Sequence, residues 1–352
     1  MEIPKATVQA HKGARVTSVD VAALAGVSQA VVSRAFTPGA PIAQETRKRV
    51  LEAARKLNYV PNSIASSLTT RRTNMVAVIL GDMNNPFYMK IFKTLSSRLQ
   101  AQGRQILSFT IESGASSDDA LMRVLRYQVD GIILTSAQLS TRMTALCQDR
   151  GIPLVLLNRY IPGAEAPSVR CDNAGGGRMI AEAFLRAGAR RFAVIKGDPR
   201  GTTSKDRLSG FLARLQEEGI KRRDILEVEG KSLYEEARIA VLEAFDSGTH
   251  PLPDAIFGIN DSMAMGAMDA LRGVMGLRVP GDVMVAGFDD IEEGARWPYR
   301  LTTVRQPIDI MVDEAIALLR LDGKTEISGT GLDRRISGEL IWRDTIAGPA
   351  QC

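Results

Sequence analysis

The sequence predicts an α/β protein in which a small all-α unit precedes a larger body of two doubly wound parallel sheets. Positive charge is concentrated in residues 1–72, which hold eleven Lys and Arg against four Asp and Glu, whereas the remaining residues hold 34 against 36. Beyond residue 72, short continuous apolar runs alternate with amphipathic helical patterns. Such runs are typical of parallel strands that are buried on both faces.

Composition narrows the class of protein. A length of 352 residues allows two or three domains. No run of 18 apolar residues occurs, so no membrane span is expected, and the first residues lack the apolar segment of a secretory signal. Cys147, Cys171 and Cys352 lack metal-ligand spacing and are typical of reduced thiols. We therefore expect a cytoplasmic protein without a metal site or cofactor.

Residues 17–60 carry the pattern of a helix-turn-helix unit. Thr17 or Ser18 can cap a first helix, Gly26 can turn the chain with positive φ, and Ser28 can cap a second helix. Small and branched apolar residues are spaced as two touching helices require. A basic module with this pattern favours a nucleic-acid partner.

The second helix is the natural recognition element of that unit. Gln29, Ala30 and Arg34 are expected to point away from its apolar side. A glutamine can bridge adenine, an arginine can fork onto guanine, and an alanine can meet the methyl group of thymine. The alternative is that these are ordinary solvent-facing side chains. A third helix with a basic outer face is expected at 44–57, and residues 1–16 are expected to form a flexible arm.

At fixed spacing, residues 17–72 resemble the DNA-binding headpiece of the lactose-repressor (LacI/GalR) family. The matching stretches are Asp20-Val21-Ala22, Ala25-Gly26-Val27-Ser28, Val32-Ser33-Arg34, Thr46-Arg47 and Leu57-Asn58-Tyr59-Val60-Pro61-Asn62. The resemblance implies a headpiece at 17–62 in which Gln29, Ala30 and Arg34 read bases in the major groove. It implies that the residues contacting phosphates or bracing the helix are Thr17, Ser28, Ser33, Thr46, Tyr59 and Asn62.

Residues 63–72 resemble the hinge helix and linker of the same family. The family's hinge helix folds only on operator DNA, where paired leucines wedge into the minor groove, and Leu68 occupies that place. Ala65 belongs to the same DNA-contacting segment. Leu68 could instead be a linker residue that packs on the body. The loop 37–41 and Ala43 depart from the family pattern, so the resemblance does not assign an operator sequence.

The remaining residues, 73–352, resemble the family's periplasmic-binding-protein-like core. Strands are expected at 75–80, 105–109, 131–134, 154–157, 192–195, 255–257 and 283–288, with another after about 301. Helices are expected at 87–102, 118–128, 141–150, 174–187, 205–218, 233–245, 261–275 and 308–319. The resemblance implies an N-subdomain of 73–170 plus 302–331 and a C-subdomain of 171–301 plus 332–352, joined by three crossings.

Polar and aromatic residues follow these strands, at the sheet edge where such bodies bind ligands. The candidates for an effector site are Asp82, Phe87, Tyr88, Asn158, Arg159, Thr203, Arg207, Phe257, Asn260 and Asp289. Forked arginines and a carboxylate bind vicinal hydroxyls, and aromatic rings stack on the apolar face of a sugar. The effector is therefore expected to be a small polar metabolite, with a sugar or sugar acid favoured.

Six of the effector candidates also have a structural alternative. Arg207 and Asp289 could form an ion pair across the cleft. Phe87 and Tyr88 could serve the core or a dimer contact. Asp82 and Asn260, like many polar residues at strand ends, could cap helices.

Together these features predict a sequence-specific DNA-binding regulator, most simply a repressor, whose homodimer binds a pseudo-palindromic operator in the nucleoid under control of the effector. The alternatives are a metabolic enzyme or a solute-binding protein fused to a DNA-binding module. The two histidines, His11 and His250, do not follow strands, which argues against catalytic triads. The glycine run 175–177 could cradle a phosphate, but close helix packing is the favoured explanation, because no Lys follows in the right place.

Overall fold

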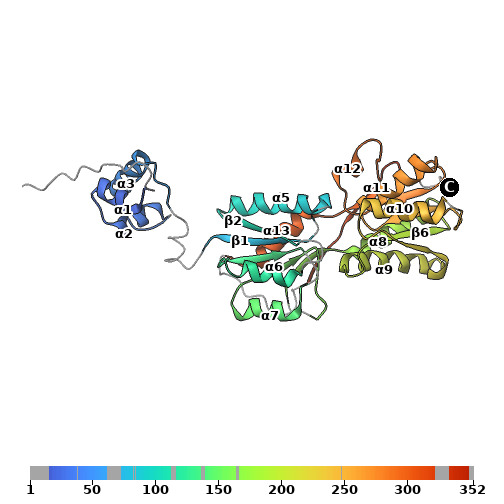
Figure 1. Cartoon of the computed structure of the whole chain (residues 1–352), viewed down its shortest axis with the longest axis horizontal. Helices are drawn as coiled ribbons and strands as arrows, with labels where there is room; N and C mark the ends of the chain where they lie inside the picture. The colour runs from blue at the N-terminus through green and yellow to red at the C-terminus, as the bar shows by residue number, and fades with distance from the viewer. Residues whose placement is uncertain are drawn as a thin grey trace, which may run out of the picture. The chain divides into compact units, whose positions relative to one another are not determined.

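A computed structural model provides the structure of the chain. It describes residues 16–37, 39–61, 73–81, 83, 85–111, 116–135, 139–163, 166–246, 248–321 and 333–348. The chain divides into two compact units, a headpiece up to Thr73 and a body from Asn74 onward (Figure 1). Within the described ranges no single helix is long and apolar enough to cross a membrane; only the bent pair of the first two helices passes on length and composition together.

Three short helices form the headpiece. They are α1 (Ser18–Ala25), α2 (Gln29–Phe36) and α3 (Gln44–Lys56). Thr17 caps α1 as expected, because its hydroxyl accepts from the Asp20 amide while the Asp20 carboxylate accepts from the Thr17 amide. Gly26 ends α1 with a φ of 64°, which glycine adopts without strain. Ser28 holds the cap position of α2, but its side chain makes none of the expected capping hydrogen bonds.

The headpiece helices share one core. Val21, Val32 and Val50, one from each helix, are fully or almost fully buried in it. Arg47 does not lie on the basic outer face that the sequence predicted for α3. Its guanidinium donates to the backbone oxygens of Ala35 at 2.8 Å and Ala40 at 3.1 Å. Arg47 therefore ties the start of α3 to the end of α2, where these carbonyls would otherwise lack partners.

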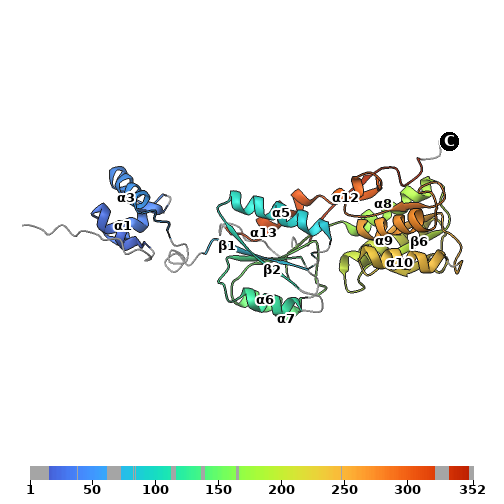
Figure 2. The same cartoon turned by 45° about the horizontal axis from the view of Figure 1, so that its top comes forward.

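The N-terminal half of the body is a six-stranded sheet covered on both faces. Its elements are β1 (Met75–Leu80), α5 (Pro86–Ala101), β2 (Gln105–Thr110), α6 (Ser117–Val124), β3 (Gly131–Leu134), α7 (Thr141–Asp149), β4 (Leu154–Leu157), β5 (Ser168–Cys171), α13 (Ile308–Leu318) and β11 (Asp333–Ile336). The strands are all parallel, in the order β11-β5-β4-β3-β1-β2. Helices α5 and α13 lie on one face and α6 and α7 on the other (Figures 1 and 2).

The C-terminal half is built around a four-stranded parallel sheet in the order β7-β6-β8-β9. Its elements are α8 (Asn173–Arg186), β6 (Phe192–Lys196), α9 (Thr202–Glu217), η1 (Arg222–Asp224), β7 (Leu226–Glu229), α10 (Tyr234–Phe245), β8 (Ala255–Gly258), α11 (Asp261–Asp269), η2 (Ala270–Val274), β9 (Met284–Ala286) and α12 (Glu292–Ala295). An antiparallel pair, β10 (Thr303–Arg305) and β12 (Glu339–Ile341), accompanies it.

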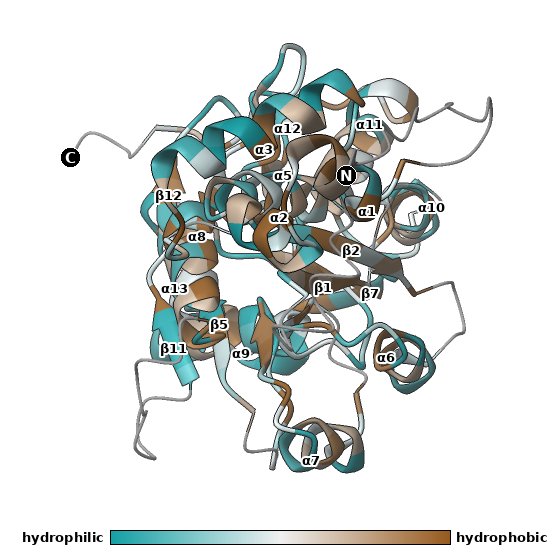
Figure 3. Cartoon of the chain, turned by 90° about the vertical axis from the view of Figure 1, so that its left-hand side faces the viewer, coloured by the Kyte–Doolittle hydropathy of each residue, from teal (hydrophilic) through white to brown (hydrophobic). Residues whose placement is uncertain are grey.

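Continuous apolar runs in the sequence correctly predict the strands at the centre of each sheet. Strands β1, β3, β4 and β8 are buried along most or all of their length, and the apolar colouring of β1 is plain in Figure 3. Strands β5 and β7 were not predicted, because they carry charged residues such as Arg170 and Glu227 within four-residue segments. The edge strand β7 is only partly buried, so it need not be apolar on both faces. Strand β5 is buried, but it can hold Arg170 because that side chain is ion-paired with Asp206 and Asp333, so hydropathy alone misses both strands.

The chain crosses between the halves at positions that differ from the expected ones. Segment 302–331 was assigned to the N-subdomain, yet its first strand, β10, pairs with β12 and bridges to the C-terminal half through Ala286–Thr302 and Asp289–Arg305. Segment 332–352 was assigned to the C-subdomain, yet its first strand, β11, pairs with β5 in the six-stranded sheet. Main-chain pairing decides the side on which each strand lies, and hydropathy does not report that pairing.

Helices α8 and α9 approach each other closely enough to require glycine. A Cβ atom on Gly177 would lie 2.1 Å from the carbonyl oxygen of Arg207, and one on Gly210 would lie 2.0 Å from that of Ala174. Real Cβ atoms do not reach such distances without a shift of the backbone. The interpretation of the glycine run as a close-packing feature is therefore confirmed at Gly177.

Asp261 is a buried acid at the start of α11, beside strand β10. Its carboxylate accepts from the Thr303 hydroxyl at 2.5 Å and from the Ile291 amide at 2.8 Å. Burial, together with the nearby carboxylate of Asp289, raises the pKa of Asp261 to about 7. In the folded body the neutral form of this side chain therefore predominates up to about pH 7.

The first prediction concerns the contact between α8 and α9. Gly177→Ala should lower the free energy of unfolding by about 1–3 kcal/mol, because the added methyl group overlaps backbone atoms of α9. Thermal unfolding of the full chain measures the effect. Gly273→Ala is the control, since its Cβ would meet nothing within 4 Å and it sits in a helical turn. Equal melting temperatures for the two variants would contradict the close contact.

The second prediction concerns pH. The folded-state pKa of Asp261 is raised above its unfolded value, so the stability it contributes is fully present below the ordinary carboxyl pKa of 3.8. That stability is lost as the pH rises through about 7. Asp261→Asn should flatten the decline in unfolding free energy between about pH 4 and 7, measured by urea denaturation, whereas Asp246→Asn at an exposed position should not. An unchanged slope in Asp261→Asn would refute the assignment.

Candidate functional site

Helix α2 presents a polar face opposite its buried side. Val32 and Ala35 are buried in the headpiece core. The exposed residues on the helix include Gln29, Ala30, Ser33 and Arg34. The Gln29 amide donates to the Ser18 hydroxyl at 2.8 Å, and the Arg34 guanidinium donates to the backbone of Ala30 at 3.4 Å. These bonds are local, and they leave the end groups of both long side chains at the surface.

The other headpiece candidates differ in exposure. Thr17 and Ser28 are exposed at the starts of α1 and α2, while Thr46 and Tyr59 are half-buried. The Tyr59 ring lies 5.9 Å from that of Phe36, so its ring braces the helices. The candidates Asn62, Ala65 and Leu68 lie outside the described residues, as does Asp82 in the body.

A small, nearly closed cavity of about 30 Å³ lies between the two halves of the body. Of the predicted effector residues, it is lined by Phe87, Tyr88, Asn158, Arg159, Thr203, Arg207, Asn260 and Asp289. Sequence reasoning missed four further lining residues, namely Asn85, Ser204, Ser232 and Ile259. Ser232 follows β7, a strand that hydropathy did not reveal. The other three lie within two residues of a predicted effector residue, but nothing in the local sequence distinguished them from their neighbours.

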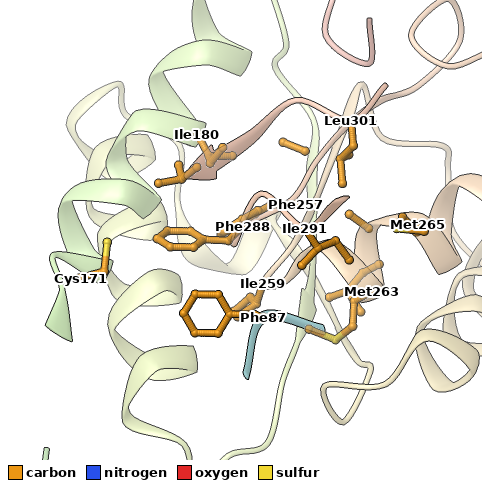
Figure 4. Packing of buried hydrophobic residues seen from close by; sticks show 14 of the residues in the cluster. Phe87, Cys171, Ile180, Phe257, Ile259, Met263, Met265, Phe288, Ile291 and Leu301 are labelled. Carbon is orange, nitrogen blue, oxygen red and sulfur yellow. The ribbon is translucent and has the colours of Figure 1, made fainter. Parts of the chain in front are cut away.

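Phe257 does not line this cavity. It is fully buried on β8, and its ring lies 5.0 Å from that of Phe211 in the core of the C-terminal half. A residue inside a parallel strand points into the layers that cover the sheet, whereas residues just after the strand reach the ligand edge. Ile259 and Asn260 hold that later position. Figure 4 shows Phe257 beside Phe288, with Ile259 lying closer to Phe87.

The position of the cavity follows from sheet topology. β1 has β2 on one side and β3 on the other, and β6 likewise lies between β7 and β8. The chain reverses its direction of winding at these central strands, and the loops after them diverge to leave a crevice. The two halves place these crevices against each other, so the lining residues all follow the carboxyl ends of parallel strands.

Arg207 and Asp289 form a buried ion pair at 3.0 Å. Both residues belong to the C-terminal half, so the pair does not cross the cleft as the structural alternative supposed. Arg207 also donates to the Asn173 side chain and to the Ile259 carbonyl, each at 2.8 Å, and lies 3.8 Å above the centre of the Phe288 ring. The guanidinium is therefore fixed in direction before any ligand arrives.

Asp289 extends this arrangement toward the other half. Its carboxylate accepts from Gln306 at 2.7 Å and from Asn85 at 3.2 Å. Asp289 and Asn158 also adopt positive φ values of 131° and 62°, which are costly for residues other than glycine. Strained backbone at two lining residues is typical of a functional site.

Arg159 links the two halves across the cavity. Its guanidinium donates to the Thr203 hydroxyl on α9 at 2.7 Å and to the Tyr88 hydroxyl on α5 at 2.9 Å. At the rim, Asp206 of α9 accepts from Arg170 at 2.7 Å and from Tyr160 at 3.1 Å. These contacts hold the halves together.

Asn260 and the two aromatic candidates have structural roles as well. The Asn260 side chain accepts from the Met263 amide at 2.8 Å, so it caps α11 as the alternative supposed. Phe87 and Tyr88 are buried, and their rings meet edge-on with centres 5.4 Å apart. Within the described ranges, no group of three or more His, Cys, Asp or Glu is placed to hold a metal ion.

Comparisons with known proteins agree with both units. Residues 17–62 match the model of bacterial regulatory proteins of the lacI family, and residues 73–310 match that of periplasmic binding proteins and the sugar binding domain of the LacI family. The regulator CelR of Thermobifida fusca is 33% identical over 87% of this chain and 92% of its own length. A solved CelR–cellobiose complex has a TM-score of 0.68 at 30% identity, covering 94% of this chain and all of that one.

A Lac repressor dimer bound to operator and the anti-inducer ONPF shares the fold, with a TM-score of 0.83 at 24% identity over 95% of this chain and all of that one. The relatives are named as regulators and repressors of transcription, which decides against the enzyme and solute-binding alternatives. With a matching headpiece, a matching body and relatives aligned over most of both chains, this protein belongs to the LacI family of bacterial transcriptional regulators.

Proposed function

We propose that this regulator is a repressor whose dimer holds a pseudo-palindromic operator and responds to a sugar or sugar acid in the cleft of its body. This proposal rests on one observation, namely that two features occur together in this member of the family. One is an exposed polar face on α2, and the other is a polar cleft between two halves of the body. The exposed face of α2 is suited to contact DNA bases, and the polar cleft is suited to bind the hydroxyl groups of a ligand.

Base reading is assigned to the exposed face of α2. Gln29, Ala30 and Arg34 can lie in a major groove while Val32 and Ala35 anchor the helix to the core. Phosphate contacts or bracing are assigned to Thr17, Ser28, Ser33, Thr46, Tyr59 and Asn62. Ala65 and Leu68 are assigned to a minor-groove contact. Because DNA is the partner, the protein is expected to act in the cytoplasm, at the nucleoid.

Effector control is assigned to the relative position of the two halves. Residues from both halves line the cavity, so a ligand that contacts both favours one arrangement over others. A coupling of about 1–3 kcal/mol between effector and operator would change operator affinity about 5- to 150-fold. The three crossings, after β5, after β10 and between β11 and β12, are the segments about which the halves would move.

The third prediction tests operator reading. Selection from random DNA at about 150 mM salt should enrich a pseudo-palindrome with two equivalent half-sites. Arg34→Ala should weaken binding to that sequence by about 1–3 kcal/mol and relax the preference at one position of each half-site.

Arg55→Ala is the matched control, because Arg55 is an exposed arginine on α3 rather than α2. It should weaken binding evenly across sequences, as the loss of a phosphate contact does. Unaltered sequence preference in Arg34→Ala would remove α2 from its assigned role, and enrichment of a single half-site would contradict the dimer.

The fourth prediction tests the cleft as the effector switch. Asp206 lies at the rim and bonds to Arg170 and Tyr160 of the other half without lining the cavity. If the closed cleft is the effector-bound form, Asp206→Asn should raise the effector concentration for half-release of labelled operator by about tenfold, because a charged hydrogen bond across the rim is weakened.

D-Galacturonate, D-glucuronate, D-galactose and D-glucose are the ligands to titrate. Glu217→Gln is the control, since Glu217 is on the same helix but pairs with the exposed Arg178 of its own half. It should leave the titration unchanged. The same release curve for wild type and Asp206→Asn would mean that rim contacts between the halves do not govern the response.

A further inference from the structure

We infer that the effector is a singly charged sugar acid whose carboxylate binds at Arg159, between Asn158 and the start of α9. This inference rests on the proposed effector site and narrows its ligand class. Three observations carry it: the balance of charge in the cavity, the free amino end of α9, and buried polar atoms without partners.

The described lining of the cavity carries one uncompensated positive charge. Arg207 is neutralised by Asp289 at 3.0 Å. Arg159 donates only to the hydroxyls of Thr203 and Tyr88, and no described carboxylate lies within ion-pair distance of it. Asp198, a carboxylate that interacts electrostatically with Arg159, is already paired with Arg200 at 3.0 Å. A guanidinium that is half-buried and bonded only to neutral groups favours an anionic ligand.

Helix α9 adds to this positive potential. It begins at Thr202 and runs for 16 residues, and its capping residue, Gly201, has no side chain to accept the first amides. In the part of the chain described, no hydrogen bond engages the amides of Thr202, Thr203 or Ser204. A Cβ atom on Gly201 would lie 2.9 Å from Arg159, so the guanidinium and the helix start adjoin. The free amides and the dipole of such a helix start attract anions.

Buried polar atoms in the same place lack partners. The Nε of Arg159 and the Oδ1 of Asn158, both from lining residues, make no hydrogen bond among the described atoms, and neither does the Oγ1 of Thr202. Asn158 is only 2% exposed, and its strained backbone holds it at the cavity. Buried groups without partners are costly, so a ligand that satisfies them gains affinity. A carboxylate can accept from Nε, and a neighbouring hydroxyl can donate to Oδ1.

The amount of charge favours a carboxylate over a phosphate. One uncompensated guanidinium balances one carboxylate, whereas a phosphate monoester carries about 1.5 to 2 negative charges at neutral pH. The rest of the lining suits hydroxyl groups, because the side-chain amides of Asn85 and Asn260 and the hydroxyls of Ser204 and Ser232 are groups that exchange hydrogen bonds with hydroxyls. The ligand is thus acidic at one end and hydroxylated along the rest.

The test uses sugars that differ only at carbon 6, bound to the full chain and measured by isothermal titration calorimetry at low salt. One trio is D-galacturonate, D-galactose and D-galactose 6-phosphate, and the other is the corresponding D-glucose series. At least one uronate should bind about tenfold or more tightly than its hexose and its phosphate. Arg159→Gln should reduce that preference to within about twofold, and Arg159→Lys should restore part of it.

Lys205→Gln is the matched control, because it removes the same charge from the first turns of α9 but is exposed and does not line the cavity. It should keep the preference for the uronate. Hexoses binding as tightly as uronates, or phosphates binding more tightly, would overturn the acid inference while leaving a sugar effector in place. If no member of either trio binds although operator is still selected, the acid inference and the effector class both fall, and DNA reading stands.

Discussion

The buried pair of Arg207 and Asp289 is the interaction on which the architecture of the cleft depends. Removing two charges from water is expensive, and the cost is offset only when every remaining donor and acceptor is satisfied. Here Asn173, the Ile259 carbonyl and Gln306 supply those partners from α8, the end of β8 and the segment after β10. The pair thus ties three parts of the C-terminal half to the edge that faces the ligand.

The same pair also connects the C-terminal half of the body to the N-terminal half. Asn85, at the start of α5, donates to Asp289, and further contacts through Arg159 and Asp206 join the halves at the cavity and at its rim. Apolar contacts accompany these polar ones, because a single cluster of buried hydrophobic residues includes Phe87 of the N-terminal half and Ile259 and Phe288 of the C-terminal half. A ligand that replaces the directional polar bonds at the cavity can favour another relative position of the halves, which is what an effector switch requires.

Patterns along the chain predicted the parts of this protein that local physical chemistry controls. The cap at Thr17, the turn at Gly26 and the central strands such as β1 all depend on near neighbours or on burial on both faces, and all were found as expected. Most of the effector candidates also lie together, because residues just after parallel strands share one edge of a sheet. Membership of the LacI family was recognisable from the headpiece motifs for the same local reason.

Tertiary structure decided what depends on distant partners. Strands β10 and β11 lie in the halves opposite to those expected, because main-chain pairing rather than hydropathy places them. Phe257 was a candidate for the site but packs in the core of the C-terminal half. Ser232 was not a candidate, yet it lines the cavity after a strand that hydropathy did not predict. The unbalanced charge at Arg159 among the described lining residues could not be read along the chain either. It exists because Asp289 is bonded to Arg207, and only the folded arrangement determines which arginine each carboxylate neutralises.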